Sequence, residues 1–409
     1  MTPVAAALAW LQRGPRRALA FATTGVALAV LLGGVIGSAA PPGAPPRLYV
    51  EVGEQPVAGR PLDVSVSVDV PAIVRLRYAD TTLEEVAQEL RVSLLAEAGA
   101  WALEIEAEDA AGRVGHDSRV VYAAWPPEPR LEAPDALTIG DALFVRLAWG
   151  LEPQREPRLR VVDVGVELDG VPQPGLRRGD EYVVLLPLPL QAEPGDRNLR
   201  GVVVDAFGNA HETHGVVRVA PNPNPVQELN VAPATLAVIT PEGRELEART
   251  LEKAFAAVGP LPRWDRPFLL PVEGRHTSAF GLPRRYAPGG PVSFHLGTDI
   301  AAPTGTPVLA TNAGVVRVAG MYPIKGGLVV LDHGFGVTSL YFHQSALAVS
   351  VGDVVERGQV IGSVGSTGLS TGPHLHWEMR VDGVPTAPLA WVDRRWPGGP
   401  VLAPDQVVD

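Results

Sequence analysis

Apolar residues alternate with polar or small ones in three stretches of the chain. Residues 62–69, 101–108 and 162–169 each place apolar side chains at every second position. A period of two residues is typical of antiparallel strands that bury one face, because side chains alternate sides along a strand. We therefore predict a mainly β protein.

A short motif recurs within this β region. Asp-Ala-Ala-Gly at 109–112 and Asp-Ala-Phe-Gly at 205–208 are each followed by a Val-Val pair, and the motifs begin 96 positions apart (109 to 205). That spacing is about the length of one β-sandwich. We predict two tandem immunoglobulin-like sandwiches, over 47–125 and 126–220. Such domains often act as spacers or as docking surfaces for a protein partner, and the fold alone does not say which.

The N-terminal pattern is different. Residues 18–40 contain no charge, and three arginines lie within 13–17. These 23 residues exceed the roughly 20 that span a bilayer, and the arginines favour the cytoplasmic side. We expect a single-pass membrane protein whose bulk is extracytoplasmic. The predicted parts are a cytoplasmic tail at 1–17, a transmembrane helix at 18–40 and a proline-rich spacer at 41–46. The alternative is a cleaved signal peptide ending at Ser38-Ala39-Ala40, although signal cores usually span only about 7–15 residues.

A linker over 221–266 separates the sandwiches from the C-terminal part. It begins with Pro221-Asn222-Pro223-Asn224-Pro225 and later carries apolar residues at helical spacing, including Leu251, Ala254 and Phe255. We predict one short helix at about 245–258, because Gly259-Pro260 would end it. The remaining divisions are a compact domain at 267–396 and a tail at 397–409.

Charge and cysteine content exclude some functions. The net charge is −11, which argues against nucleic acid as a partner. The absence of cysteine excludes disulfides, so any immunoglobulin likeness is one of architecture.

Candidate chemistry is concentrated in the C-terminal domain. His374 and His376 are two residues apart, so on a strand both would point the same way. His295 and Asp299 are four apart and could share one face of an extended segment. Two imidazoles and one carboxylate with an open position form a catalytic zinc site. One histidine is then left for acid–base chemistry, and His343 could join it.

These residues lie among motifs that resemble the lysostaphin-type zinc metallopeptidases, a family of secreted cell-wall endopeptidases. The resemblance covers residues 267 to about 391. The matching motifs follow one another in the family's order, which is a more specific signal than the His-x-His pair alone. The matching segments are, in order, Ser278–Gly281, His295–Pro303, Gly305–Val308, Ala313–Val316, Leu331–Gly334, Tyr341–His343, Val351–Asp353, Gly358–Gly362, Gly365–Gly368 and His374–His376.

The resemblance implies an antiparallel β-sheet peptidase domain with Zn²⁺ bound by His295, Asp299 and His376. It assigns His343 and His374 to catalysis, where one imidazole takes a proton and the other stabilises the oxyanion. Which histidine has which role stays open. The implied substrate is the peptide part of peptidoglycan.

We therefore expect a membrane-anchored zinc metalloendopeptidase that remodels the cell wall. One alternative is a non-hydrolytic regulator that activates wall amidases, since some family members have lost zinc ligands. Others are a diffusible wall-lytic enzyme, if 18–40 is cleaved, and an adhesion or scaffold protein with a trimming activity.

The other histidines have simpler interpretations. His211 and His214 form His-x-x-H without a third ligand nearby in the sequence, so we predict surface residues. His333 precedes a glycine and is predicted to be a structural turn residue. His116 and His276 are predicted to lie in loops.

Overall fold

A computed structural model describes residues 43–53, 57–150, 157–228, 238–264, 266–285 and 289–393. The chain divides into two compact units, Met1–Ala123 and Ala124–Asp409. The predicted tail at 1–17, membrane helix at 18–40 and C-terminal tail at 397–409 lie outside the described residues. Within the described ranges, no helix has the length and apolar character needed to cross a bilayer.

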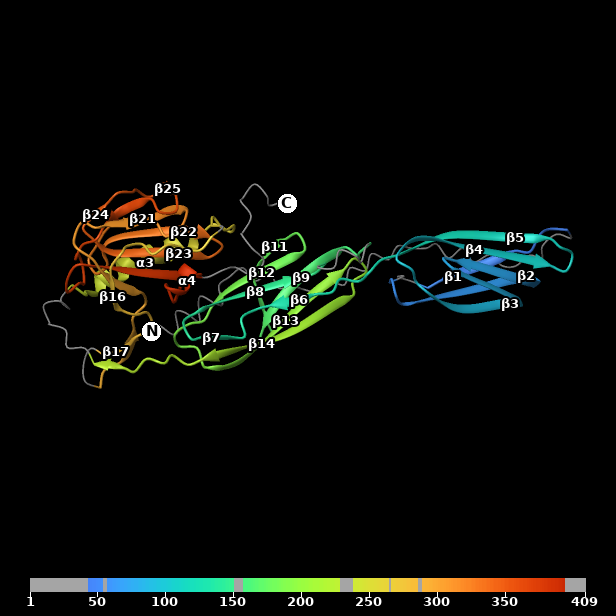
Figure 1. Cartoon of the computed structure of the whole chain (residues 1–409), viewed down its shortest axis with the longest axis horizontal. Coiled ribbons are helices and arrows are strands. Elements are labelled where there is room, and N and C mark those ends of the chain that lie inside the picture. Colours follow the sequence, from blue (N-terminus) through green and yellow to red (C-terminus); the bar gives the residue numbers. More distant parts are fainter. Residues whose placement is uncertain are drawn as a thin grey trace. The chain divides into compact units, whose positions relative to one another are not determined.

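The first unit is built from long antiparallel strands (Figure 1). Its strands are β1 (Leu48–Val52), β2 (Pro61–Tyr78), β3 (Thr81–Leu95), β4 (Gly99–Asp109) and β5 (Val114–Ala123). The alternation predicted at 62–69 is confirmed, because Leu62, Val64 and Val66 are buried while Asp63 is exposed.

The immunoglobulin-like arrangement predicted for 47–125 does not appear in this strand pairing. All five strands belong to one sheet, whereas that fold has two. The reason is the length of β2: it pairs with β1 through Val64–Val68, with β4 through Ala72–Tyr78 and with β3 along both parts.

The second unit begins with a two-sheet β-sandwich. Its strands are β6 (Arg130–Glu132), β7 (Ala136–Thr138), β8 (Ala142–Ala148), β9 (Val161–Leu168), β10 (Val171–Gln173), β11 (Leu176–Arg178), β12 (Glu181–Pro187), β13 (Gly195–Asp205) and β14 (Ala210–Ala220). One sheet has the order β10-β9-β13-β14-β7 and the other β11-β12-β8-β6. Their facing side chains, such as Val145, Val184 and Leu199, form a shared apolar core.

The repeated motif corresponds to the same hairpin turn in both units. The Asp109 carboxylate accepts hydrogen bonds from the backbone N–H groups of residues 111 and 113, and Asp205 does the same for residues 207 and 209. Gly112 and Gly208 have φ of 75° and 85°, the left-handed region that glycine adopts without strain. The sequence repeat therefore corresponds to a local turn that both units contain.

Strands β8 and β12 are buried on both faces. Along β8, Leu143 and Val145 face the sandwich core, whereas Ala142 and Phe144 join the core of the C-terminal domain. Along β12, alternate residues divide in the same way. The sandwich and the C-terminal domain therefore share a continuous apolar core inside the second unit.

The C-terminal domain is dominated by one antiparallel sheet. Its order is β16-β19-β27-β23-β22-β21-β25, with β28 paired to β27; β20-β26-β24 and β15-β17-β18 form two smaller sheets. The strands are β15 (Gln227–Glu228), β16 (Arg275–Ser278), β17 (Pro283–Arg285), β18 (Val292–Phe294), β19 (Thr298–Ala301), β20 (Pro307–Leu309), β21 (Gly314–Tyr322), β22 (Gly326–Gly334), β23 (Val337–Gln344), β24 (Ala346–Leu347), β25 (Val354–Val355), β26 (Val360–Ser363), β27 (His374–Val381) and β28 (Val384–Thr386). Every residue of β22 and β23 is buried, which makes the centre of the sheet a rigid support.

The predicted linker helix is present as α3 (Pro241–Ala256), and a short α4 (Ala390–Asp393) follows β28. Helix α3 begins four residues before the predicted start, because Thr240 caps it and Pro241 occupies its first turn. Leu251 and Ala254 of α3 pack against the apolar face of the sheet. Buried Glu247 accepts hydrogen bonds from the backbone N–H groups of Ile324 and Lys325.

Truncating Leu251 to alanine should lower the free energy of unfolding of the second unit by about 2–5 kcal/mol, the usual cost of deleting a buried leucine. Leu251 is 7% exposed, whereas Leu246 on the same helix is 49% exposed. Leu246→Ala is therefore the control and should change the free energy by less than about 0.5 kcal/mol. Denaturant unfolding measures both values, and equal losses would contradict the packing of α3.

Candidate metal centre

His295 is held in a short connection between β18 and β19. The prediction that it shares one extended segment with Asp299 is wrong, because His295 precedes β19 and Asp299 lies within it. Gly297 allows the turn between them: a Cβ there would lie 2.5 Å from the Trp377 carbonyl oxygen and 2.7 Å from His376 Nε2. The chain thus bends closely around β27, and His295 returns toward Asp299.

Neighbouring strands supply the other two residues. Asp299 of β19 is directly paired with His376 of β27, and Ala301 with His374. Paired residues in adjacent antiparallel strands place their side chains on the same face at short range. The strand placement predicted for His374 and His376 is confirmed.

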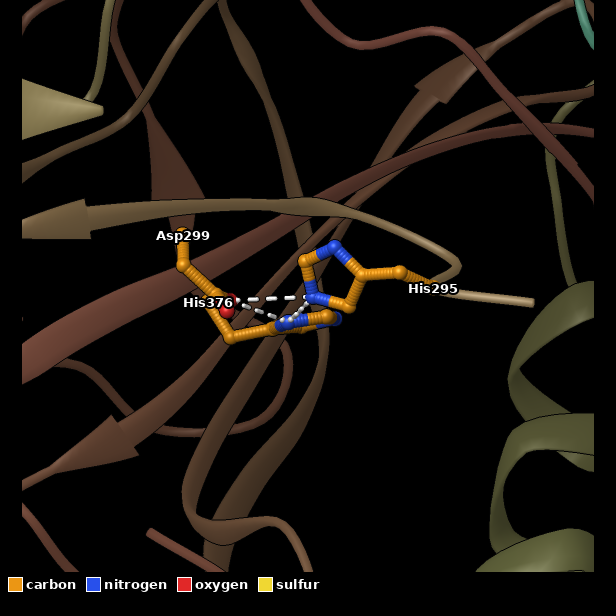
Figure 2. A group of neighbouring side chains, drawn as sticks. All are labelled: His295, Asp299 and His376. Atoms are coloured by element: carbon orange, nitrogen blue, oxygen red, sulfur yellow. Dashed lines mark hydrogen bonds and ion pairs between the residues drawn. The ribbon is translucent and has the colours of Figure 1, made fainter. Parts of the chain in front are cut away.

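The three predicted ligands meet at one point (Figure 2). His376 Nδ1 lies 2.8 Å from Asp299 Oδ1, and His295 Nε2 lies 3.1 Å from the same oxygen. The two ring nitrogens are 3.0 Å apart. Ligands on a tetrahedron of zinc–nitrogen radius about 2.0–2.1 Å would be separated by about 3.3 Å, so the spacing suits a small metal ion.

The outer hydrogen bonds of the two imidazoles fix which nitrogen faces the centre. His295 Nδ1 is 2.8 Å from the Ala279 carbonyl oxygen, and His376 Nε2 is 3.1 Å from Glu378 Oε1. Both partners accept hydrogen bonds, so each of these nitrogens must donate. The opposite nitrogens then direct lone pairs at each other and at a carboxylate. Such a set of acceptors requires a positive charge at its centre, and a divalent metal ion fits it.

Glu378 is a buried partner of His376 that the sequence analysis did not identify. It lies two positions after His376 on the same face of β27, and it is 3% exposed. Arg380 donates to Glu378 Oε2 through Nε at 2.7 Å and pairs with it through Nη2 at 2.6 Å. The sequence did contain a signal for Glu378, because His374, His376, Glu378 and Arg380 are spaced two residues apart and so lie on one face of a strand. Glu378 orients the His376 ring as carboxylates commonly do beside metal-bound histidines.

The pKa shifts show that this cluster favours a positive charge. Burial opposes protonation of His376, but Asp299 and Glu378 outweigh it and raise its pKa to about 9. Burial also opposes ionisation of Glu378, yet Arg380 and His376 lower its pKa to about 2. The pKa of Asp299 is lowered as well, because hydrogen bonds from His295 and His376 outweigh its burial. A bound cation would replace the proton on His376.

His343 and His374 lie beside the three predicted ligands. Their ring centroids are 4.8 Å apart, and His374 Nε2 is 3.8 Å from Asp299 Oδ1. His343 Nδ1 donates to the Thr367 carbonyl and His374 Nδ1 to the Gly372 carbonyl, each at 2.8 Å. Both Nε2 atoms therefore keep a lone pair in the neutral rings. Burial, followed by the nearby His376 and His374, lowers the pKa of His343 to about 3.

The end of β23 departs from regular alternation. His343 has φ of 63°, in the left-handed region that costs non-glycine residues energy. Phe342, which precedes it, stacks on His376 with centroids 4.8 Å apart and an interplanar angle of 25°. His343 also faces the cluster, with its ring 6.1 Å from that of His376. The unusual φ lets two consecutive side chains reach the same site.

The remaining histidines are not part of the centre. His333 lies within β22 rather than in a turn. Its Nδ1 donates to the Ala313 carbonyl at 2.7 Å, its Nε2 lies 2.7 Å from Ser339 Oγ, and burial lowers its pKa to about 4. His211 contacts Asp205, and His214 is exposed beside Glu212. The sequence analysis placed two others in loops, but both are exposed strand residues: His116 of β5 and His276 of β16.

Glu378→Gln should weaken metal binding by about 10–100-fold, because a neutral amide holds the His376 ring less strongly than a carboxylate does. Glu273→Gln is the matched control, since Glu273 is exposed. Titration against a competing chelator measures both dissociation constants. An unchanged constant for Glu378→Gln would show that Glu378 only supports the fold.

Comparison with known proteins places the site within a recognised sequence domain. Residues 293–388 match the model of Peptidase family M23. The DD-carboxypeptidase/endopeptidase Mpg of Neisseria meningitidis serogroup B is 49% identical over 97 residues, which are 24% of this chain and 22% of that protein. The peptidoglycan DD-endopeptidase ShyC of Vibrio cholerae is 39% identical over 115 residues, 28% of this chain and 27% of that protein.

Among solved structures, a putative peptidase M23 from Pseudomonas aeruginosa is 30% identical with a TM-score of 0.39, covering 56% of this chain and 87% of that one. The chain matches only about a quarter of the length of the two curated relatives. The matched segment nevertheless contains all three residues of the cluster and both neighbouring histidines. Residues 293–388 are therefore a Peptidase family M23 domain.

Proposed function

We propose that this protein is a zinc-dependent metalloendopeptidase that hydrolyses peptide bonds of peptidoglycan. The observation that carries the proposal is the convergence of His295 Nε2, Asp299 Oδ1 and His376 Nδ1. The curated relatives named as peptidoglycan endopeptidases support the substrate class.

In the proposed hydrolysis, some residues of the centre bind the metal ion and others transfer protons. His295, Asp299 and His376 would hold the ion, and Glu378 keeps His376 oriented. When bound, zinc supplies Lewis-acid activation of water and of the scissile carbonyl. The lone pairs on Nε2 of His343 and His374 can accept a proton and return it to the leaving amine. A ring that has taken up the proton can also donate a hydrogen bond to the developing oxyanion.

The complete set of residues favours an enzyme over a non-hydrolytic regulator of amidases. A regulator has no need for three converging acceptors together with two further histidines that keep free lone pairs.

The cellular location is a separate part of the proposal. We propose that residues 18–40 anchor the chain in the cell membrane, with the M23 domain on the extracytoplasmic side. This rests on the uncharged segment and on the arginines that precede it. Fractionation distinguishes the alternatives, because a soluble mature protein that begins at Pro41 would instead be a diffusible enzyme.

Digestion of purified peptidoglycan tests the activity. The zinc-loaded protein should release products with new peptide termini, and a chelator should stop the reaction until zinc is restored. A regulator would release no products alone but would stimulate an added amidase, which cuts between glycan and peptide. That result from a zinc-loaded sample would contradict the proposed enzyme.

A further inference from the structure

We propose that the second β-sandwich is a structural part of the metal centre, because it fixes the loop that positions His295. We call residues 278–282 the His295 support loop. The inference rests on the proposed function only in taking His295 as a metal ligand.

The support loop holds His295 through both its side chain and its backbone. The Ala279 carbonyl accepts from His295 Nδ1 at 2.8 Å, and Ser278 Oγ lies 3.3 Å from the same nitrogen. The Gly281 N–H donates to the His295 carbonyl at 2.8 Å, and the His295 N–H donates to the Leu282 carbonyl at 2.9 Å. A shift of this loop therefore moves the imidazole directly.

The β-sandwich covers this loop with apolar side chains. Ile139, Leu188, Leu190 and Val219 form a buried cluster in the sandwich. The side chains packed against that cluster include Phe280 of the support loop and the two neighbours of His295, namely Phe294 and Leu296. The ligand is thus flanked on both sides along the chain by residues anchored in the sandwich.

The approach of the two parts is close enough to restrict the loop. A Cβ on Gly140 would lie 2.6 Å from Phe280 Cε1, and Gly140 has φ of 94°. A Cβ on Gly281 would lie 3.3 Å from both Leu190 Cδ2 and Asn222 Nδ2. Asn222, just after the sandwich, also donates from Nδ2 to the Gly281 carbonyl at 2.6 Å. Side-chain packing and a hydrogen bond therefore act on the same loop.

The sandwich is itself fixed to the C-terminal domain away from this loop. Phe144 and Leu185 belong to the same buried cluster as Trp391 and Met379. Because the sandwich is held at a second place, it can act as a rigid support rather than following the loop as it moves. It then reduces the range of His295 positions before metal binds, which lowers the cost of ordering the ligand.

Two variants of the full chain separate this role from general stabilisation. Leu190→Ala removes packing against the support loop, whereas Leu199→Ala removes an equally large buried side chain from the separate core between the two sheets of the same sandwich. Asn222→Asp keeps the acceptor used by Asn224 but loses the donor to Gly281. Since outer contacts of metal ligands commonly change affinity by about 10–100-fold, we expect losses near 10-fold for Leu190→Ala and Asn222→Asp.

The readout is zinc affinity by chelator competition, together with the visible spectrum of the cobalt-substituted protein. Leu190→Ala and Asn222→Asp should weaken binding and alter the spectrum, and Leu190→Met should restore both. Leu199→Ala should lower stability but keep the affinity and spectrum of the unmodified chain. Equal losses for Leu190→Ala and Leu199→Ala, or none for Asn222→Asp, would overturn the inference. Peptidoglycan hydrolysis does not enter this readout, so a protein that binds zinc but cleaves nothing would refute only the proposed enzyme.

Discussion

Replacing His295 with alanine should remove the bound zinc and lower peptidoglycan hydrolysis by about 10³-fold or more. The Lewis acid contributes several kcal/mol to catalysis, and each 1.36 kcal/mol corresponds to a factor of ten in rate. The variant also leaves Asp299 Oδ1 and His376 Nδ1 as two ligands, 2.8 Å apart, without the third. Metal analysis of the purified protein and the rate of muropeptide release measure the two effects.

His276→Ala is the matched control for this change. His276 is an exposed histidine of β16, on the strand paired with the one that carries Asp299. It should retain one zinc per chain and the full rate. If His295→Ala retained zinc with the affinity of the unmodified chain, the assignment of His295 as a ligand would be wrong.

Replacing His343 or His374 with alanine should leave zinc bound but reduce turnover by about 10²–10⁴-fold, the usual contribution of a positioned acid or base. Each ring is held by a hydrogen bond to a backbone carbonyl, and neither is part of the cluster of three acceptors. The expected loss therefore lies in kcat, with the zinc content unchanged. Steady-state kinetics and metal analysis on the same samples separate the two effects.

A different result would reassign the roles of the histidines on β27. His374 and His376 are on the same face of that strand, so loss of zinc in His374→Ala with zinc retained in His376→Ala would exchange ligand and catalytic residue. Unchanged turnover in both His343→Ala and His374→Ala would exclude either ring from proton transfer.

The sequence predicted the strand-borne part of the site well. The His-x-His spacing placed His374 and His376 on one side of β27, because strand alternation is a local property of the backbone. The same reasoning extended to residue 378 would have found the buried Glu378. The helix was also predictable from its apolar spacing, although the cap at Thr240 set an earlier start.

Other features depended on contacts between distant segments. The position of His295 follows from a turn at Gly297 against β27, which no local period encodes. The single sheet of the first unit follows from the 18 residues of β2, which pair with different neighbours along their length. The apolar runs in β8 and β12 did carry a signal, because strands buried on both faces lack polar alternation. These apolar runs could therefore have predicted that β8 and β12 lie between the sandwich core and the M23 domain.

The most direct test of the central claim is anomalous diffraction at the zinc absorption edge from crystals of the zinc-loaded protein. We expect one strong peak about 2.0–2.2 Å from His295 Nε2, Asp299 Oδ1 and His376 Nδ1. The Nε2 atoms of His343 and His374 should lie outside bonding distance of that peak. No peak among these three atoms, or a peak bonded to His343 or His374 in place of one of them, would contradict the proposed metal centre.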